Sequence, residues 1–254
     1  MAEFWLPDQA ATTVRRKQVA GAIDSMVQAV AAERQKLVQV ANAVGARLET
    51  AAAMLHRALE LLAAARSADH AEGSRPAVEL TVRTTFEVTC RGRFLILSPD
   101  GPEEFTAMVT DFWRTEKDLT DKIGQVVVPL PEYLAALVDP KRRRKPRNLW
   151  EICKTLDEVD QRPMTDAYSA RASYTTLYQW LSNAASHGGL GAVRRFTRAE
   201  QSVLHIVDRP EPMTTHWPIP VIAAHVGELA VVVLEAFDLN ADAVRESGVV
   251  LPRR

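Results

Sequence analysis

Apolar residues recur at helical spacing along most of the chain, and the longest such stretch covers residues 13–66. This stretch has no proline, is rich in alanine, and repeats its apolar positions about every 3.5 residues, which keeps one seam facing a partner helix. The pattern predicts one very long helix, or two nearly collinear helices bent near Gly45, because glycine weakens a helix by about 1 kcal/mol against alanine. We expect the seam to pack within the chain; a homodimer through it is the alternative.

The next helix, from Pro76 to Leu97, combines an apolar row with a row of charges. The apolar row is Val78, Val82, Phe86 and Cys90, and the charged row beside it is Glu79, Arg83, Glu87 and Arg91. Two interpretations fit this arrangement. It is either a ladder of surface ion pairs, worth about 0.3–0.5 kcal/mol each, or a partly buried ionic row held against other helices. Cys90 lies in the apolar row, which favours an inert core thiol.

Further apolar periodicities and breaks predict the rest of a helical bundle. Helices are expected at 103–123, 133–138, 148–159, 174–189 and 221–237, the third opened by a capping box from Asn148 to Glu151. Residues 196–207 fit a short helix or a pair of strands equally well. We therefore predict an all-α fold. It forms a single domain over 1–254, with a long N-terminal helix at 13–66 packed on a core bundle at 76–239.

Composition narrows the functional classes. The net charge is −1, which argues against a protein that coats nucleic acid with its whole surface. Two cysteines are too few for a disulfide framework, and the six histidines show no pair at metal-ligand spacing, so we expect neither a metal nor a cofactor. The apolar stretch 218–237 contains His225, Glu228 and Glu235, which favours a buried helix over a membrane span. We expect a cytoplasmic protein without a membrane segment.

A strongly basic run lies between two predicted helices. Residues 141–147 carry six positive charges, a density that requires an exposed loop. The loop is either a site for RNA phosphates or an acidic partner, or a solvated connector. In the first case the binding residues are Arg142, Arg143, Arg144 and Lys145.

Two motifs together resemble a known group of proteins. Arg83-Thr-Thr-Phe-Glu87 on one helix and Tyr178-Gln-Trp-Leu-Ser182 on another, followed by His187, are similar to motifs of a family of uncharacterised, all-helical bacterial proteins of unknown function. The similarity covers residues 76–190 and the last helix. More distantly, the layout resembles HEPN helical domains, several of which are metal-independent ribonucleases in toxin–antitoxin and antiphage systems.

The resemblance to HEPN domains implies a set of catalytic residues. Their site is usually an Arg-Asn pair with a His one turn later; Asn183 and His187 match it, while Ser182 stands in the place of the Arg. Arg83 supplies the missing charge if the two helices face each other. His187 would then handle the proton of the RNA 2′-hydroxyl, and Arg83 would hold the phosphate. As a structural alternative, His187 stabilises the end of its helix through the helix dipole.

From these residues we expect His187, Arg83, Glu87, Asn183 and Ser182 to converge in space. The implied function is an HEPN-like ribonuclease or a nucleotide- or RNA-binding protein in phage defence or stress response. The alternative is a non-catalytic helical interaction or scaffold protein. The sequence leaves open whether the chain is an enzyme.

Overall fold

The computed structural model describes most of the chain. The described residues are 13–70, 75–124, 130–141, 145–160, 169–179, 181, 197–200, 203–206 and 218–250.

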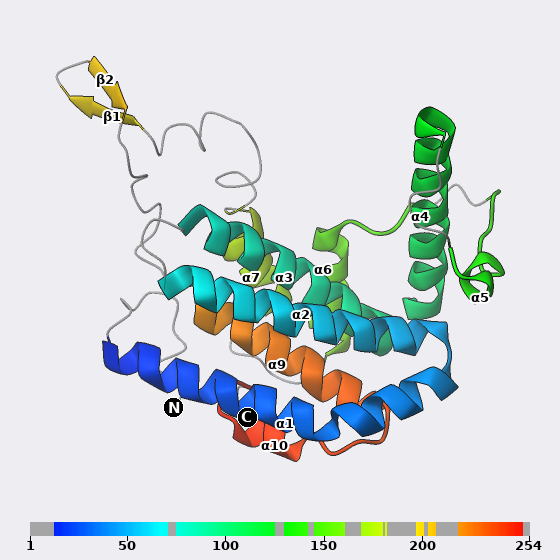
Figure 1. The fold of residues 1–254 in the computed structure, drawn as a ribbon, viewed down its shortest axis with the longest axis horizontal. Helices are drawn as coiled ribbons and strands as arrows, with labels where there is room; N and C mark the ends of the chain where they lie inside the picture. Colours follow the sequence, from blue (N-terminus) through cyan, green and yellow to red (C-terminus); the bar gives the residue numbers. More distant parts are fainter. Residues whose placement is uncertain are drawn as a thin grey trace.

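Helices form almost all of the described structure (Figure 1), which confirms the all-α prediction. They are α1 (Thr13–Val44), α2 (Ala46–His70), α3 (Arg75–Leu97), α4 (Gly101–Ile123), α5 (Glu132–Ala135), α6 (Leu149–Val159), α7 (Ala170–Ser173), the π-helical turn η3 (Tyr174–Gln179), α9 (Ile219–Ala236) and α10 (Asp242–Glu246). Strands β1 (Thr197–Glu200) and β2 (Val203–Ile206) pair antiparallel, with Thr197 opposite Ile206. This hairpin decides between the two interpretations of residues 196–207.

The N-terminal segment is a helical hairpin, so the predicted long or nearly collinear helix is wrong. Gly45 has a φ of 97°, in the left-handed region that other residues rarely adopt, and α2 runs back along α1 from this point. Ion pairs of 2.6 Å between Arg16 and Asp69 and of 2.7 Å between Arg66 and Asp24 join the two helices near the opposite end. The apolar seam is therefore buried within one chain, as expected for its packing.

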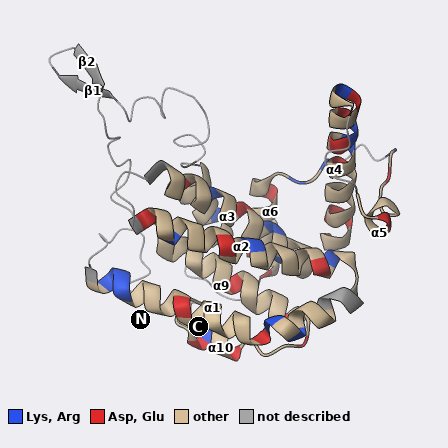
Figure 2. Cartoon of the chain, in the orientation of Figure 1, with Lys and Arg blue, Asp and Glu red and all other residues tan. Residues whose placement is uncertain are grey.

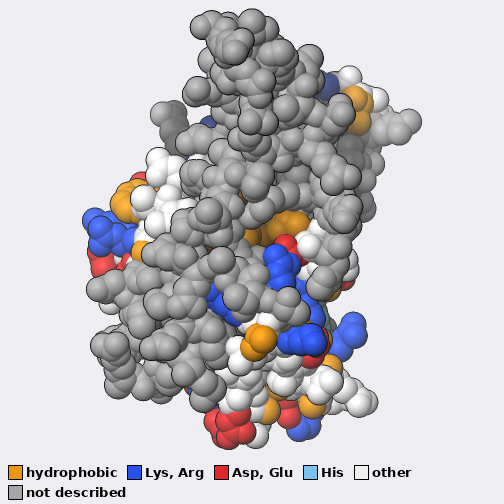
Figure 3. Space-filling view, turned by 90° about the vertical axis from the view of Figure 1, so that its left-hand side faces the viewer, with side chains coloured by type: hydrophobic (Ala, Val, Ile, Leu, Met, Phe, Trp, Pro, Cys, Tyr) orange, Lys and Arg blue, Asp and Glu red, His pale blue; other side chains and the backbone are white. Residues whose placement is uncertain are grey.

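Figure 3 looks onto the end of the bundle where α1 begins. Lys and Arg side chains gather near the middle of this face. Figure 2 shows Lys and Arg residues at the start of α1. Of the positive residues at this end, Arg16 pairs with Asp69 and Arg66 with Asp24.

Helix α9 is the centre of the bundle and contacts α1, α2 and α3. All its residues from Ile219 to Leu234 are buried. Within the described ranges it is the one helix long and apolar enough to cross a membrane, but 89% of it lies inside the protein. Such burial is typical of a core helix, which agrees with the interpretation of this stretch from its sequence.

The remaining helices cover one side and one end of this core. Helix α6 packs on α3 and begins with the predicted capping box, in which the backbone N–H of Glu151 donates to the Asn148 side chain at 3.0 Å. Helix α4 stands away from the other helices at the end of the bundle (Figure 1). Most of its residues from Phe112 onward are exposed. Of the predicted site residues, Arg83 and Glu87 lie on α3, which α6 covers.

A close approach of three helices at Gly92 gives a test of this packing. A Cβ atom at Gly92 of α3 would lie 2.8 Å from Cδ1 of Leu229 on α9 and 3.4 Å from Cβ of Met54 on α2. We expect Gly92→Val to lower the free energy of unfolding by about 1–3 kcal/mol through overpacking. Chemical denaturation measures the change. Gly21→Val is the matched control, since nothing lies within 4 Å of that position; an equal loss in both variants would contradict the packing.

Candidate functional site

The structure describes some of the predicted site residues and not others. Six of them lie outside the described residues: Ser182, Asn183 and His187, and Arg142, Arg143 and Arg144 of the basic loop. Arg83 and Glu87 lie on α3, and Lys145 is exposed between α5 and α6. The convergence of Arg83 and Glu87 with His187 therefore stays a prediction.

The charged row of α3 lies against other helices, as in the second interpretation of its sequence. Glu79 is buried, with 3% of its surface exposed, and Arg83, Glu87 and Arg91 are half-buried. Nε of Arg91 donates to Oε1 of Glu87 at 3.2 Å, one helical turn away. Water screens such a pair less than it screens a fully exposed one.

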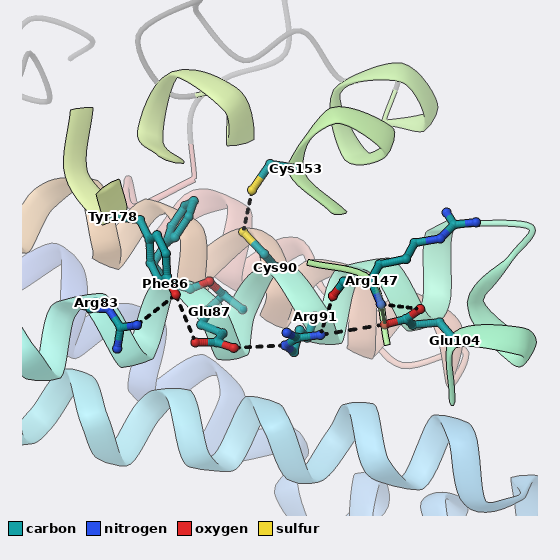
Figure 4. A network of polar contacts seen from close by, with 10 residues as sticks. Arg83, Phe86, Glu87, Cys90, Arg91, Glu104, Arg147, Cys153 and Tyr178 are labelled. Carbon is teal, nitrogen blue, oxygen red and sulfur yellow. Dashed lines mark hydrogen bonds and ion pairs between the residues drawn. The ribbon is translucent and has the colours of Figure 1, made fainter. Parts of the chain in front are cut away.

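Tyr178 of η3 connects Arg83 and Glu87 (Figure 4). Nη2 of Arg83 donates to the Tyr178 hydroxyl at 3.0 Å, and this hydroxyl donates to Oε2 of Glu87 at 3.5 Å. The Arg83 guanidinium also lies 4.7 Å from the centre of the Tyr178 ring, within the range of a cation–π interaction. Two charges of α3 thus meet the segment that leads to His187.

The same network continues along α3 to the residue that ends the basic run. Arg91 forms an ion pair of 3.7 Å with Glu104, the buried carboxylate of α4. Glu104 accepts the backbone N–H of Arg147 at 2.9 and 3.2 Å, and the Arg147 side chain pairs with Asp100 at 2.5 Å. These contacts fix the chain between the basic run and α6. Arg147 is thus tied to α4, at the edge of the run whose central arginines lie outside the described part of the chain.

Tyr178 also belongs to a row of aromatic and arginine side chains. We call it the stacking row and define it as Arg171, Trp150, Tyr174, Tyr178 and Arg83 in spatial order. The guanidinium of Arg171 lies 5.6 Å from the Trp150 ring, which lies 5.2 Å from the Tyr174 ring. The Tyr174 and Tyr178 rings are stacked at 5.3 Å with 24° between their planes.

The stacking row was not predicted from the sequence. Its signal is visible afterwards. Tyr174 and Tyr178 are four residues apart, while Trp150 is an aromatic residue in the first turn of the helix opened by the capping box. The contact between Trp150 of α6 and Tyr174 of η3 depends on how the two elements pack, which the tertiary fold alone shows.

A buried polar centre lies beneath this surface, between α3, α6 and α9. Arg93 is 2% exposed, and its Nη2 donates to Asp160 at 2.5 Å. Its Nε and Nη1 make no hydrogen bond to described groups. Burial by itself lowers the pKa of Arg93, but the carboxylates of Glu228 and Asp160 raise it above the ordinary value. The guanidinium stays charged and holds both carboxylates to α3.

His225 of α9 is a neutral core residue. Its Nε2 lies 2.8 Å from Oγ of Ser173, and its ring meets the edge of Phe86 at 5.0 Å. Burial, with a smaller effect of the Arg93 charge, lowers the pKa of His225 to about 3. A ring that stays neutral throughout the physiological range does not serve as a proton acceptor near pH 7.

The two cysteines face each other in the same core. Sγ of Cys153 on α6 lies 3.9 Å from Sγ of Cys90 on α3, and both residues are fully buried. The hydrogen bond to Cys90, followed by burial, raises the pKa of Cys153 far above its usual value. Protonated thiols are poor nucleophiles. The prediction of an inert core thiol agrees with this burial, and no cluster of three metal-ligating side chains occurs among the described residues.

The neutral state of His225 makes stability depend on pH. Between pH 6.5 and about 3 the unfolded chain binds a proton at this residue and the folded chain does not. The folded protein therefore has its full stability with respect to His225 above pH 6.5, and it loses stability as the pH falls toward about 3. We expect this effect to lower the free energy of unfolding by about 2 kcal/mol at pH 5 relative to pH 7. Urea denaturation at the two pH values measures this change.

His225→Gln removes the titrating group and should flatten this dependence, whatever its own effect on stability. His56→Gln is the comparison, because burial and Arg34 also lower the pKa of His56, which is only half-buried. An unchanged pH slope in His225→Gln would show that other groups cause it.

Comparison of the chain with protein-family models, with curated proteins and with solved structures finds no match in any of the three. The resemblance to HEPN domains therefore stays a prediction, and the function has to be inferred from the contacts of the described side chains.

Proposed function

We propose that the chain is an HEPN-like, metal-independent ribonuclease that binds RNA where α3 meets η3. The observation that carries the proposal is the contact of Arg83 and Glu87 with Tyr178, nine residues before His187. A cation and a carboxylate of α3 thereby contact η3, the element that precedes the HEPN-like Asn183 and His187 in the sequence.

Arg83 is suited to bind a phosphate at this place. Its Nη2 donates to the neutral hydroxyl of Tyr178. Hydrogen bonds to a charged acceptor are roughly twice as strong as those to a neutral one, so a phosphate oxygen competes well with the hydroxyl. Glu87 pairs with Arg91 and accepts from Tyr178, which orients the surrounding groups. Arg83 can then stabilise the charge that develops on the phosphate.

The proposed reaction uses the RNA 2′-hydroxyl as the nucleophile. His187 takes its proton, the 2′-oxygen attacks the phosphorus, and the bond from phosphorus to the 5′-oxygen breaks. A proton then passes to the leaving 5′-oxygen, so no external co-reactant is needed. Ser182 and Asn183 would contact the phosphate or sugar.

The second candidate function is a non-catalytic scaffold, and one observation favours it. Arg91, Glu104 and Arg147 form a network that ties α3, α4 and the chain before α6 together. Such a network stabilises a fold without requiring a substrate. In this case Arg83 and Glu87 would be its continuation.

Cleavage of a labelled RNA by the purified chain, with a metal chelator present, tests the proposal. We expect His187→Ala and Arg83→Ala each to reduce the cleavage rate by about 100-fold or more, the usual effect of removing a group that acts on the transition state. Their melting temperatures should stay close to that of the parent protein.

Arg57→Ala is the matched control, since Arg57 is an exposed α2 residue paired only with Glu60 among described contacts. It should cleave at the parent rate. Absence of cleavage by the parent protein, combined with a large drop in melting temperature in Arg83→Ala, would support the scaffold instead.

A further inference from the structure

We propose that the stacking row binds the unpaired bases of single-stranded RNA and leads the strand toward Arg83. This inference rests on the proposed function and specifies its substrate as single-stranded rather than duplex RNA. It is carried by the geometry and exposure of the five side chains of the row.

The row is continuous and comes from four separate elements. Trp150 belongs to α6, Arg171 to α7, Tyr174 and Tyr178 to η3, and Arg83 to α3. Each neighbouring pair lies between 4.7 and 5.6 Å apart, measured between ring centres or from a guanidinium carbon to a ring centre. Guanidinium groups and aromatic rings are the planar groups on which nucleobases stack.

The outer end of the row is open to solvent. Trp150 is 38% exposed and Arg171 is exposed, whereas Tyr174 and Tyr178 are half-buried. Phe86, 6.0 Å behind Tyr178, is fully buried and anchors the inner end to the core. Trp150 and Arg171 are therefore the exposed members of the row, and Tyr174, Tyr178 and Arg83 are half-buried.

Contacts beneath the row hold it in place. The carboxylate of Asp157 on α6 accepts the backbone N–H groups of Ala170 and Arg171 at 2.8 and 3.1 Å. The side chain of Ser169 accepts the N–H of Ala172 at 3.1 Å. These bonds fix the start of α7 on α6 and so set the position of Tyr174 against Trp150. A platform ordered before binding loses little entropy when a base stacks on it.

The chemistry of the row selects unpaired bases. In a duplex the faces of the bases are covered by their neighbours, so aromatic side chains reach them only in single strands, loops or ends. Stacking tolerates any base, and the cations at both ends of the row attract the phosphates between the bases. A base stacked on the exposed Trp150 would bring the neighbouring phosphates along the row toward Arg83, beside the proposed reaction centre.

Binding of fluorescently labelled single-stranded RNA, measured by anisotropy at one fixed salt concentration, tests the inference. An uncleavable strand with 2′-O-methyl groups separates binding from cleavage. We expect Trp150→Ala to weaken binding roughly tenfold, the order of one lost base stack, and Trp150→Phe to retain most of it. Arg171→Ala should weaken binding less, and a duplex of the same sequence should bind more weakly than the single strand.

Trp113→Ala is the matched control. Trp113 lies on α4, half-exposed, with the Lys117 ammonium 5.5 Å from its ring centre, so it is a second aromatic–cation pair away from the row. It should bind RNA like the parent protein. Equal weakening by Trp113→Ala and Trp150→Ala, or equal binding of duplex and single strand, would overturn the inference, provided that the variants keep the parent melting temperature.

Failure of the stacking-row proposal is distinguishable from failure of the proposed ribonuclease. If the parent cleaves RNA and Trp150→Ala binds normally, the stacking row is not the binding platform but the ribonuclease stands. If Trp150→Ala loses binding while the parent protein cleaves nothing, the platform stands without catalysis. Absence of any binding by the parent protein would overturn both.

Discussion

Every other feature of the bundle depends on the need to bury α9 on all sides. An apolar helix with no polar face requires neighbours around its whole circumference. Helices α1, α2 and α3 are those neighbours, and the hairpin turn at Gly45 is what lets two of them come from one continuous stretch of sequence. The polar residues His225 and Glu228 are then forced into the core. They are accommodated by Ser173 and by the charge of Arg93, which ties α6 to the same centre.

The elements that could be predicted were those governed by local periodicity. The helix of Pro76 to Leu97, the capping box at Asn148 and the buried helix near 221–237 follow from spacing and caps alone. The turn at Gly45 that sends α2 back along α1 could not be predicted from local periodicity. A glycine inside a helical pattern is compatible with a gentle bend or with a full turn, and the choice depends on the distant α9. The strand pair at 197–206 was undecidable for a related reason, since short apolar runs suit either conformation.

The candidate site shows the same division between local and tertiary information. That Arg83 and Glu87 share one partly buried face of α3 follows from their four-residue spacing. That a tyrosine hydroxyl stands between them does not, because it requires knowledge of how η3 lies on α3. Tyr178 contacts both the charged row of α3 and the other aromatic side chains of the stacking row. Its hydroxyl bonds to Arg83 and Glu87, and its ring stacks on Tyr174.

The central position of α9 also has a consequence for the order of assembly. Helices α1, α2 and α3 follow one another directly, so they can associate through short-range contacts as soon as they leave the ribosome. The helix that fills the space between them is made more than a hundred residues later. During synthesis the early helices therefore present an apolar groove with no occupant, and closing it requires a long excursion of the chain. The nascent protein passes through a stage in which its hydrophobic interior is exposed, a situation in which chains commonly depend on chaperones to avoid aggregation.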